Sequence, residues 1–362
     1  MCTSRLIRQW PLLVAVIAGM AVPELAVSAP HSDPAADVWL LESRDIPVPR
    51  GVSAALRQAI ANSPRPDVAG ALASVPETEA QWRALIAQRA KRDEVTLEAL
   101  AATYDVSITP AVIAGVAVYR VKPNTPNPTH VGQLFLHLHG GAYVYGGGNP
   151  AVGEGALIAG RVGIDSVSID YRMPPDHPFP AAIDDVVQVY RMLLKDHAAE
   201  SIAIGGTSAG GGLALAAVLQ FKALDLPLVG AIYAGTPWAD LTKTGDTLFT
   251  HEGIDRILIT YDGSLGAAAR LYAGGENLKN PLLSPLYGTF SGFPPTYLVT
   301  GTRDMFLSDV ARTHRKLRQA GVVAELNVYE GMSHADYALV LDSPESAQVY
   351  AELGAFFAKH LH

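Results

Sequence analysis

Short apolar runs alternate with helical stretches along the chain from about residue 113 onward. The runs at 134–138, 201–204 and 296–300 are rich in aliphatic, β-branched or aromatic side chains, which is the pattern of strands buried on both faces. A helical stretch at 181–195 separates the first two. This order predicts an α/β fold with a mostly parallel central sheet covered by helices on both faces.

The stretch from about residue 38 to residue 102 has a different pattern. Segments such as 81–88 place apolar residues at helical spacing, and no run alternates like a strand. We expect residues 29–104 to form a helical cap region and residues 105–362 to form the α/β domain. The proline-rich segment 122–128 is interpreted as a hairpin connection between two strands.

A glycine-rich turn follows the second of these strands. Residues 205–212 read Gly-Gly-Thr-Ser-Ala-Gly-Gly-Gly and lead from the run at 201–204 into an apolar helical stretch. Gly206 and Gly210 allow a tight turn, which presents the Ser208 hydroxyl at a strained apex before the helix. A Gly-x-Ser-x-Gly between a strand and a helix predicts a nucleophile elbow, with Ser208 as the nucleophile.

Two adjacent glycines, Gly140 and Gly141, follow the strand at 134–138. An acyl-transfer reaction places negative charge on the former carbonyl oxygen, and preorganised backbone N–H groups stabilise that charge. We expect the N–H groups of Gly140, Gly141 and Ala209 to form this oxyanion hole, and we expect His139 to brace the loop. The alternative is a glycine-rich turn that only packs closely.

A serine nucleophile needs a base to take its proton and a carboxylate to orient that base. In folds with this elbow the acid and the histidine follow the serine in chain order. Asp304 follows the strand at 296–300, and His334 follows an alternating run at 326–329. The sequence therefore predicts a triad of Ser208, Asp304 and His334.

Three other carboxylates compete for the role of the acid. Asp309 is the strongest competitor because it lies five residues after Asp304, although we expect it to open a helix at 310–320. Glu330 and Asp336 lie close to His334 in sequence, but neither follows the preceding strand.

Two tyrosines follow the predicted oxyanion loop. Tyr143 and Tyr145 are candidates for lining the acyl or alcohol pocket, with simple packing as the equal alternative. Glu154 is a candidate for holding the loop by hydrogen bonds.

These motifs resemble those of the hormone-sensitive-lipase-like α/β-hydrolases, the bacterial family IV esterases, in the subgroup whose elbow reads GTSAGG. The resemblance covers roughly residues 105–362. It includes the loop His139-Gly140-Gly141-Ala142, the segment 170–182, the elbow 206–211 and the tail 330–334. The chain departs from the family pattern at Ala142, where many relatives have a third glycine, and in the segment 304–309, where many relatives have Asp-Pro followed by a second Asp.

The resemblance implies hydrolysis of short- to medium-chain carboxylic esters through an acyl-enzyme intermediate, without a metal ion or organic cofactor. It also implies that the N-terminal helices, with an insertion at about 240–286, form a cap over the site. An amidase or deacetylase with the same triad is an alternative. A non-catalytic ligand receptor on the same fold is a second alternative, which the three filled triad positions disfavour.

The N-terminus has the pattern of an export signal. Arg5 and Arg8 precede an apolar stretch at 11–22 that is too short to span a bilayer, and small residues follow it. We expect cleavage near residue 28, giving an exported protein that is periplasmic or secreted, with a retained N-terminal anchor as the alternative. The only cysteine, Cys2, lies in this leader, so the mature chain would contain no disulfide.

The formal net charge of the chain is −8, and removal of residues 1–28 would change it to −9 because that segment carries one net positive charge. An acidic protein of this kind is a poor partner for nucleic acid or anionic membrane surfaces. We therefore expect a small-molecule ester substrate, no nucleic acid and no stable membrane insertion of the mature chain. The sequence leaves open whether the chain forms a homodimer.

Overall fold

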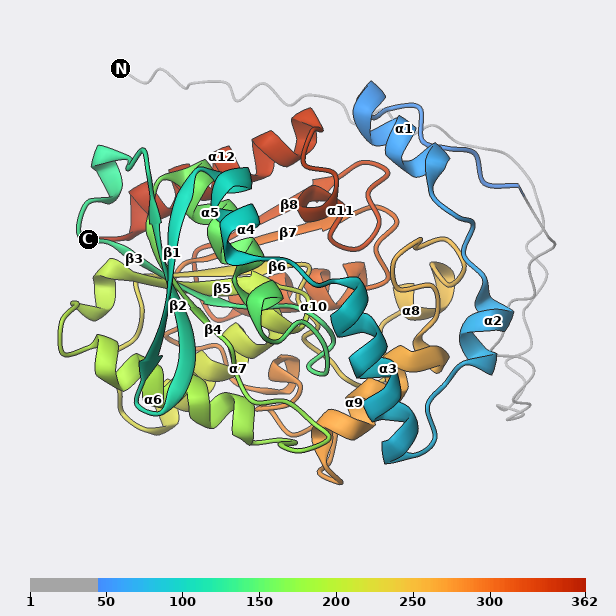
Figure 1. The fold of residues 1–362 in the computed structure, drawn as a ribbon, viewed down its shortest axis with the longest axis horizontal. Coiled ribbons are helices and arrows are strands. Elements are labelled where there is room, and N and C mark those ends of the chain that lie inside the picture. The colour runs from blue at the N-terminus through green and yellow to red at the C-terminus, as the bar shows by residue number, and fades with distance from the viewer. Residues whose placement is uncertain (1–44) are drawn as a thin grey trace, which may run out of the picture. The chain divides into compact units, whose positions relative to one another are not determined.

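The computed structural model describes residues 45–362, so the predicted export signal and Cys2 lie outside the described residues. Eight strands form one sheet in the order β1-β2-β4-β3-β5-β6-β7-β8 (Figure 1). The strands are β1 (Val106–Ile113), β2 (Val116–Pro123), β3 (Leu134–Leu138), β4 (Asp165–Ile169), β5 (Ile202–Thr207), β6 (Ala231–Gly235), β7 (Thr296–Gly301) and β8 (Ala324–Tyr329).

The sheet is mostly parallel, as predicted. Strands β4, β3, β5, β6, β7 and β8 run parallel to one another, whereas β2 is antiparallel to both β1 and β4. Ile113 pairs with Val116, and both turn residues between them, Ala114 and Gly115, have positive φ angles. Two such residues twist the chain in the sense that a tight β-hairpin requires.

The interpretation of segment 122–128 as a hairpin connection is wrong. The segment leads from β2 towards β3, and these strands are not neighbours because β4 lies between them in the sheet. The prolines therefore belong to a crossover from the antiparallel part of the sheet to its parallel part.

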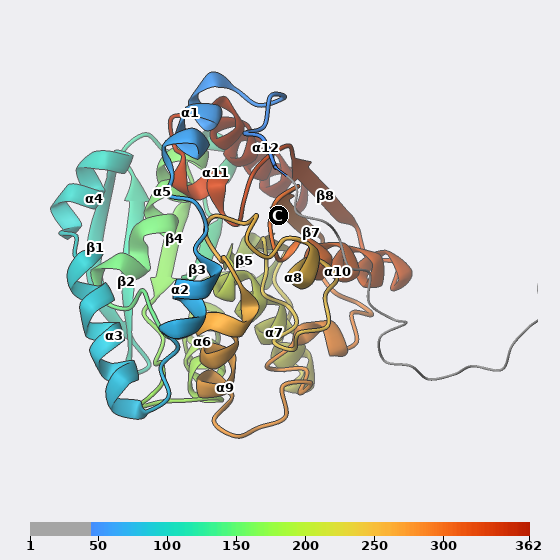
Figure 2. The ribbon, with the colours of Figure 1, turned by 90° about the vertical axis from the view of Figure 1, so that its right-hand side faces the viewer.

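Helices cover both faces of the sheet (Figures 1 and 2). On one face α5 contacts β2, β3 and β4, and α12 contacts β6 and β7. On the other face α6 contacts β2 and β4, α7 contacts β3, β5 and β6, and α10 contacts β7 and β8. These helices are α5 (Gly153–Val162), α6 (Ala181–Leu193), α7 (Ala209–Ala223), α10 (Leu307–Gln319) and α12 (Pro344–His360).

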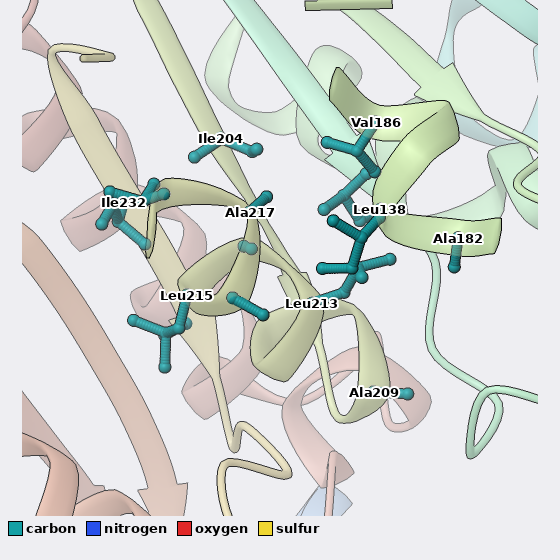
Figure 3. Packing of buried hydrophobic residues seen from close by; sticks show 14 of the residues in the cluster. Leu138, Ala182, Val186, Ile204, Ala209, Leu213, Leu215, Ala217 and Ile232 are labelled. Atoms are coloured by element: carbon teal, nitrogen blue, oxygen red, sulfur yellow. The ribbon is translucent and has the colours of Figure 1, made fainter. Parts of the chain in front are cut away.

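Helix α7 packs closely against the centre of the sheet (Figure 3). Leu213 and Ala217 of this helix belong to the same buried cluster as Leu138 of β3 and Ile204 of β5. Full burial of a leucine side chain contributes about 1.5–3 kcal/mol to stability. The apolar strands and helix faces thus fix the first turn of α7, which follows Ser208, relative to the strand ends.

The described part of the N-terminal stretch contains four helices and no strand. They are α1 (Ala54–Asn62), α2 (Val68–Ala73), α3 (Glu79–Arg92) and α4 (Leu97–Tyr104). Within residues 45–362, none of the helices combines the length and the hydropathy that crossing a bilayer requires.

A long connection between β6 and β7 holds further short helices: α8 (Thr247–Thr250), η5 (Tyr261–Leu265), α9 (Gly266–Ala273) and η6 (Pro285–Tyr287). Near the end of the chain, α11 (Asp336–Leu339) follows β8. Helix α2 contacts η5, so the N-terminal stretch and the insertion lie side by side (Figure 2).

Candidate active site

Ser208 lies at the junction of β5 and α7 with φ 64° and ψ −121°. Such a conformation costs roughly 1–3 kcal/mol for a residue with a side chain, and neighbouring structure must hold it in place. A Cβ on Gly206 or Gly210 would lie 1.9 or 2.0 Å from the Leu138 carbonyl oxygen, so only glycine allows helix and strand to approach this closely. A backbone hydrogen bond also fixes this turn to β6, because the Ser208 N–H donates to the Gly235 carbonyl at 2.8 Å.

His334 and Asp304 meet beside this turn. His334 Nδ1 lies 3.1 Å from Asp304 Oδ1, and both side chains are buried. The loop after β7 carries Asp304, and the loop after β8 carries His334, so neighbouring parallel strands deliver the two side chains to the same edge of the sheet. The rings of Phe306 and His334 pack nearly perpendicular to each other, with their centroids 4.9 Å apart.

Ser208 and His334 line one cavity. Within residues 45–362, Ser208 Oγ makes no hydrogen bond. Hydrogen bonds between a serine nucleophile and its base are often long in unliganded enzymes and tighten when substrate binds. The structure therefore brings the three predicted triad residues together, with the acid–base contact formed.

Asp304 has three further hydrogen-bond donors, two of which are threonines that sequence reasoning missed. Thr236 Oγ1 donates to Asp304 Oδ2 and lies 3.2 Å from His334 Nδ1. Thr300 Oγ1 donates to Oδ2 at 2.9 Å, and the Phe306 N–H donates to Oδ1 at 2.8 Å. The only signal in the sequence is that Thr236 follows β6 directly and Thr300 lies in β7.

The competing carboxylates face other partners. Asp309 Oδ2 accepts the N–H groups of Ala239 and Asp240, at 3.1 and 2.9 Å. Asp336 accepts the Ser333 N–H at 2.8 Å and pairs with Arg256. Of the four candidates, including Glu330, only Asp304 contacts the imidazole ring of His334.

Asp255, in the insertion between β6 and β7, is a third residue that the sequence did not reveal. Its fully buried carboxylate accepts the Met305 N–H at 2.9 Å and the His334 N–H at 3.4 Å. It also accepts the N–H groups of Ile257 and Leu258 in its own loop. One carboxylate thus joins the loops that carry Asp304 and His334.

The pKa values of this cluster follow from burial and charge. Burial alone would lower the pKa of His334, but the charge and hydrogen bond of Asp304 outweigh it, with Asp255 and Asp336 adding smaller contributions, and the net pKa is raised. Burial would raise the pKa of Asp304, but His334 holds it below its usual range. Burial, followed by the charge of Asp304, raises the pKa of Asp255.

The predicted oxyanion loop lies beside the elbow. A Cβ on Gly140 would lie 2.9 Å from the Thr207 carbonyl oxygen and 3.6 Å from Ser208 Cβ. Gly141 has φ 111°, and a Cβ there would lie 2.2 Å from the Tyr145 carbonyl oxygen. Within the described residues, the backbone N–H groups of Gly140, Gly141 and Ala209 donate to no protein group. An oxyanion hole needs unpaired donors of this kind.

His139 is held away from proton transfer. Its ring stacks on Tyr171, with centroids 4.0 Å apart, and Nδ1 donates to the Gly140 carbonyl at 2.7 Å. Burial lowers the pKa of His139 to about 4, so the ring is neutral near pH 7. These contacts agree with a bracing role.

The cavity has a volume of about 490 Å³, within the range of ligand pockets. Tyr145 lines it, whereas Tyr143 is 1% exposed, is absent from the lining and stacks on Tyr272 with centroids 4.1 Å apart. The structure therefore places Tyr143 in the core rather than in the pocket. The insertion contributes Ile257, Leu258 and Leu265 to the lining.

Glu154 binds the end of β5, directly before the elbow. Its carboxylate accepts the Thr207 N–H at 3.0 Å, the Thr207 hydroxyl and the Tyr233 hydroxyl at 3.1 Å. His137 Nε2 lies 3.4 Å from the same carboxylate. Glu154 thus holds the residue before Ser208, rather than the oxyanion loop itself. Within residues 45–362, no group of three or more His, Cys, Asp or Glu side chains is placed to hold a metal ion.

The chain is similar to known proteins over most of its length. A sequence model described as the alpha/beta hydrolase fold matches residues 135–338. The putative acetyl-hydrolase LipR of Mycobacterium tuberculosis is 33% identical over 251 residues, which cover 69% of this chain and 80% of LipR. An esterase of Acinetobacter venetianus is 30% identical over 253 residues, which cover 69% of this chain and 82% of the esterase.

Solved structures extend this similarity. The crystal structure of one esterase matches with a TM-score of 0.86 and 48% identity, covering 90% of this chain and 99% of the esterase. The crystal structure of an esterase from the bacterial hormone-sensitive lipase family matches with a TM-score of 0.69 and 29% identity, covering 86% of this chain and 99% of that one.

Proposed function

Since the chain belongs to the α/β-hydrolase family, among the esterases of the bacterial hormone-sensitive lipase type, and is a carboxylic ester hydrolase, we propose that it uses Ser208, His334 and Asp304 to hydrolyse short- to medium-chain esters. The observation that carries this proposal is the contact of Asp304 with His334 beside a cavity that Ser208 also lines. We also propose, from the residues of the elbow, that the chain belongs to the GTSAGG subgroup.

In the proposed cycle, His334 removes the Ser208 proton as Ser208 Oγ attacks the ester carbonyl carbon. The N–H groups of Gly140, Gly141 and Ala209 hold the negative charge that develops on the carbonyl oxygen. Protonated His334 then gives its proton to the leaving alcohol, and an acyl-enzyme forms. Water repeats these steps to release the acid, while Asp304 stays ionised and fixes the imidazole tautomer.

The size of the acyl group should follow from the parts that wall the cavity. Helix α3 contributes Arg89 and Arg92, and the insertion contributes apolar side chains. We therefore propose that the predicted cap, residues 29–104 with the insertion at about 240–286, selects substrates; of its first part the structure describes residues 45–104. A cavity of about 490 Å³ favours esters of small acids.

Hydrolysis of p-nitrophenyl esters from acetate to palmitate tests the proposal, with the wild-type protein compared with its Ser208→Ala variant. We expect turnover of the short esters that falls by about 10⁶-fold in the variant. A Ser208→Ala protein that retains wild-type turnover, or a folded wild-type protein without any, would reject the serine mechanism.

The prediction that the protein is exported rests on the residue pattern of positions 1–28. We propose that this segment is removed and that the mature protein acts outside the cytoplasm. The N-terminal sequence of the protein recovered from the culture medium or periplasm tests this, and an intact leader in the cytoplasm would contradict it.

A further inference from the structure

One cavity-lining cation has no carboxylate partner. Within residues 45–362, the side chain of Arg89 makes neither an ion pair nor a hydrogen bond, although it lines the same cavity as Ser208. Its guanidinium lies over the ring of Tyr145, 4.1 Å from the ring centroid. A cation–π contact of this kind fixes the position of a guanidinium without neutralising its charge.

The contact with Tyr145 leaves the hydrogen-bonding groups of Arg89 available, because a ring centroid is not an acceptor in the guanidinium plane. The N–H donors of a guanidinium point outward within its plane. In that plane the donors form a fork that matches the two oxygens of a carboxylate. Arg89 is therefore held in a form that can bind an anion.

The other charged side chains that line the cavity already have hydrogen-bond partners. Arg92 donates from Nε and Nη2 to the two oxygens of Asp93, at 2.7 and 3.0 Å. The pKa of Asp93 is lowered first by this hydrogen bond and only to a smaller extent by Arg89. Glu154 is saturated by Thr207 and Tyr233. On α3 and its C-cap, the lining residues Arg89, Arg92 and Asp93 together carry one net positive charge, which is that of Arg89.

The end of helix α3 alone does not account for this placement. Basic residues in a last turn stabilise the helix dipole, and Arg89, Lys91 and Arg92 all lie in the last turn of α3. Lys91 serves that purpose from an exposed position that does not line the cavity. Arg89 differs from Lys91 because it lies over Tyr145, inside the cavity wall.

From this arrangement we propose that Arg89 binds a carboxylate of the substrate, so that the preferred esters are anionic: monoesters of dicarboxylic acids or acyl esters of carboxylated alcohols. The inference rests on the proposed esterase function. Net charge cannot produce the same preference, because the whole chain carries −8 and repels anions at long range.

Two matched substrate pairs test the proposal. The first is p-nitrophenyl adipate, with a free carboxylate, and its neutral methyl ester. The second is 4-carboxyphenyl acetate and its neutral methyl ester, which place the charge on the alcohol side. For one pair we expect the anionic member to have a KM lower by about three- to tenfold in the wild-type protein, and added salt to reduce the difference.

The variants separate Arg89 from its surroundings. Arg89→Gln should abolish the preference for the anion, and Arg89→Glu should reverse the preference. Lys91→Gln removes a positive charge from the same helix turn and should leave the preference intact. Varying the number of methylenes between carboxylate and ester would then find the spacing that fits Ser208 and Arg89.

Equal KM values within both pairs, or a preference that survives Arg89→Gln, would overturn this inference. Turnover of neutral butyrate shows separately that the esterase works. A catalysis-independent measurement is calorimetric titration of monomethyl adipate into Ser208→Ala and into Ser208→Ala/Arg89→Gln. We expect binding to the first protein and at least about threefold weaker binding to the second.

Discussion

Asp304 Oδ1 lies 3.1 Å from His334 Nδ1, and both side chains are buried. The carboxylate is ionised because His334 holds its pKa below the usual range. In the proposed mechanism, an ionised acceptor at Nδ1 leaves Nε2 of the same ring to take the proton of Ser208.

Replacement of Asp304 by Asn should therefore lower kcat by about 10³- to 10⁴-fold, because an amide that donates to Nδ1 selects the wrong imidazole tautomer. Steady-state kinetics with p-nitrophenyl butyrate measure the loss. Asp309→Asn is the matched control, since Asp309 is also buried but binds the backbone N–H groups of Ala239 and Asp240 and pairs with Arg312 rather than with His334. If Asp309→Asn lost as much activity as Asp304→Asn while staying folded, the assignment of the acid would be wrong.

The pH dependence of kcat/KM should rise with pH as His334 loses its proton. Because the neighbouring carboxylates raise the pKa of His334, the midpoint of this rise should lie above the ordinary histidine value of 6.5. The charged imidazolium form is inactive as a base, so activity is lost below the midpoint. A midpoint clearly below 6.5 would show that burial outweighs the carboxylates.

Asp255→Asn should move that midpoint to lower pH, because it removes one of the negative charges that raise the pKa of His334. It should also lower kcat/KM, since the amide cannot accept all the N–H groups that the carboxylate accepts. Asp262→Asn, in the same insertion but half exposed, should change neither quantity. An unshifted pH profile in Asp255→Asn would restrict Asp255 to a structural role.

Gly141→Ala should reduce kcat by about 10²-fold, because the new Cβ would lie 2.2 Å from the Tyr145 carbonyl oxygen and must displace the loop. Gly148→Ala provides the control. Gly148 also has a positive φ, of 74°, but a Cβ there would meet nothing within 4 Å. Both variants should lose about 1–2 kcal/mol of stability from the left-handed backbone, and only Gly141→Ala should lose activity. Thermal unfolding and kinetics measured together distinguish the two effects.

The sequence predicted those parts of the site that depend on local chemistry. Ser208 is identified by the glycines around it, and Asp304 and His334 by their positions after strands. The same reasoning could not separate Tyr143 from Tyr145. The loop turns sharply after Gly141, whose carbonyl accepts two successive N–H groups, and Ala142 and Tyr143 both have positive φ. Alternation along the chain therefore no longer indicates which side chain faces the cavity.

Contacts between distant segments could not be predicted from the sequence either. Asp255 lies 79 residues before His334, and no motif marks it. The connection at 122–128 was misinterpreted for a related reason, since the strand that separates β2 from β3 comes later in the chain. Sheet order and hydrogen bonds across an insertion are settled by tertiary packing, which a pattern of neighbouring residues does not encode.

The position of Asp255 bears on how this protein could be re-engineered. The insertion between β6 and β7 would otherwise be an obvious module to exchange with a relative in order to change substrate range. The Asp255 carboxylate of this insertion binds the backbone of both Met305 and His334. A chimera with another insertion would therefore change the contacts of the loops that carry Asp304 and His334. A graft that keeps the native loop around Asp255 and replaces only the segment after it would let specificity vary while turnover is retained.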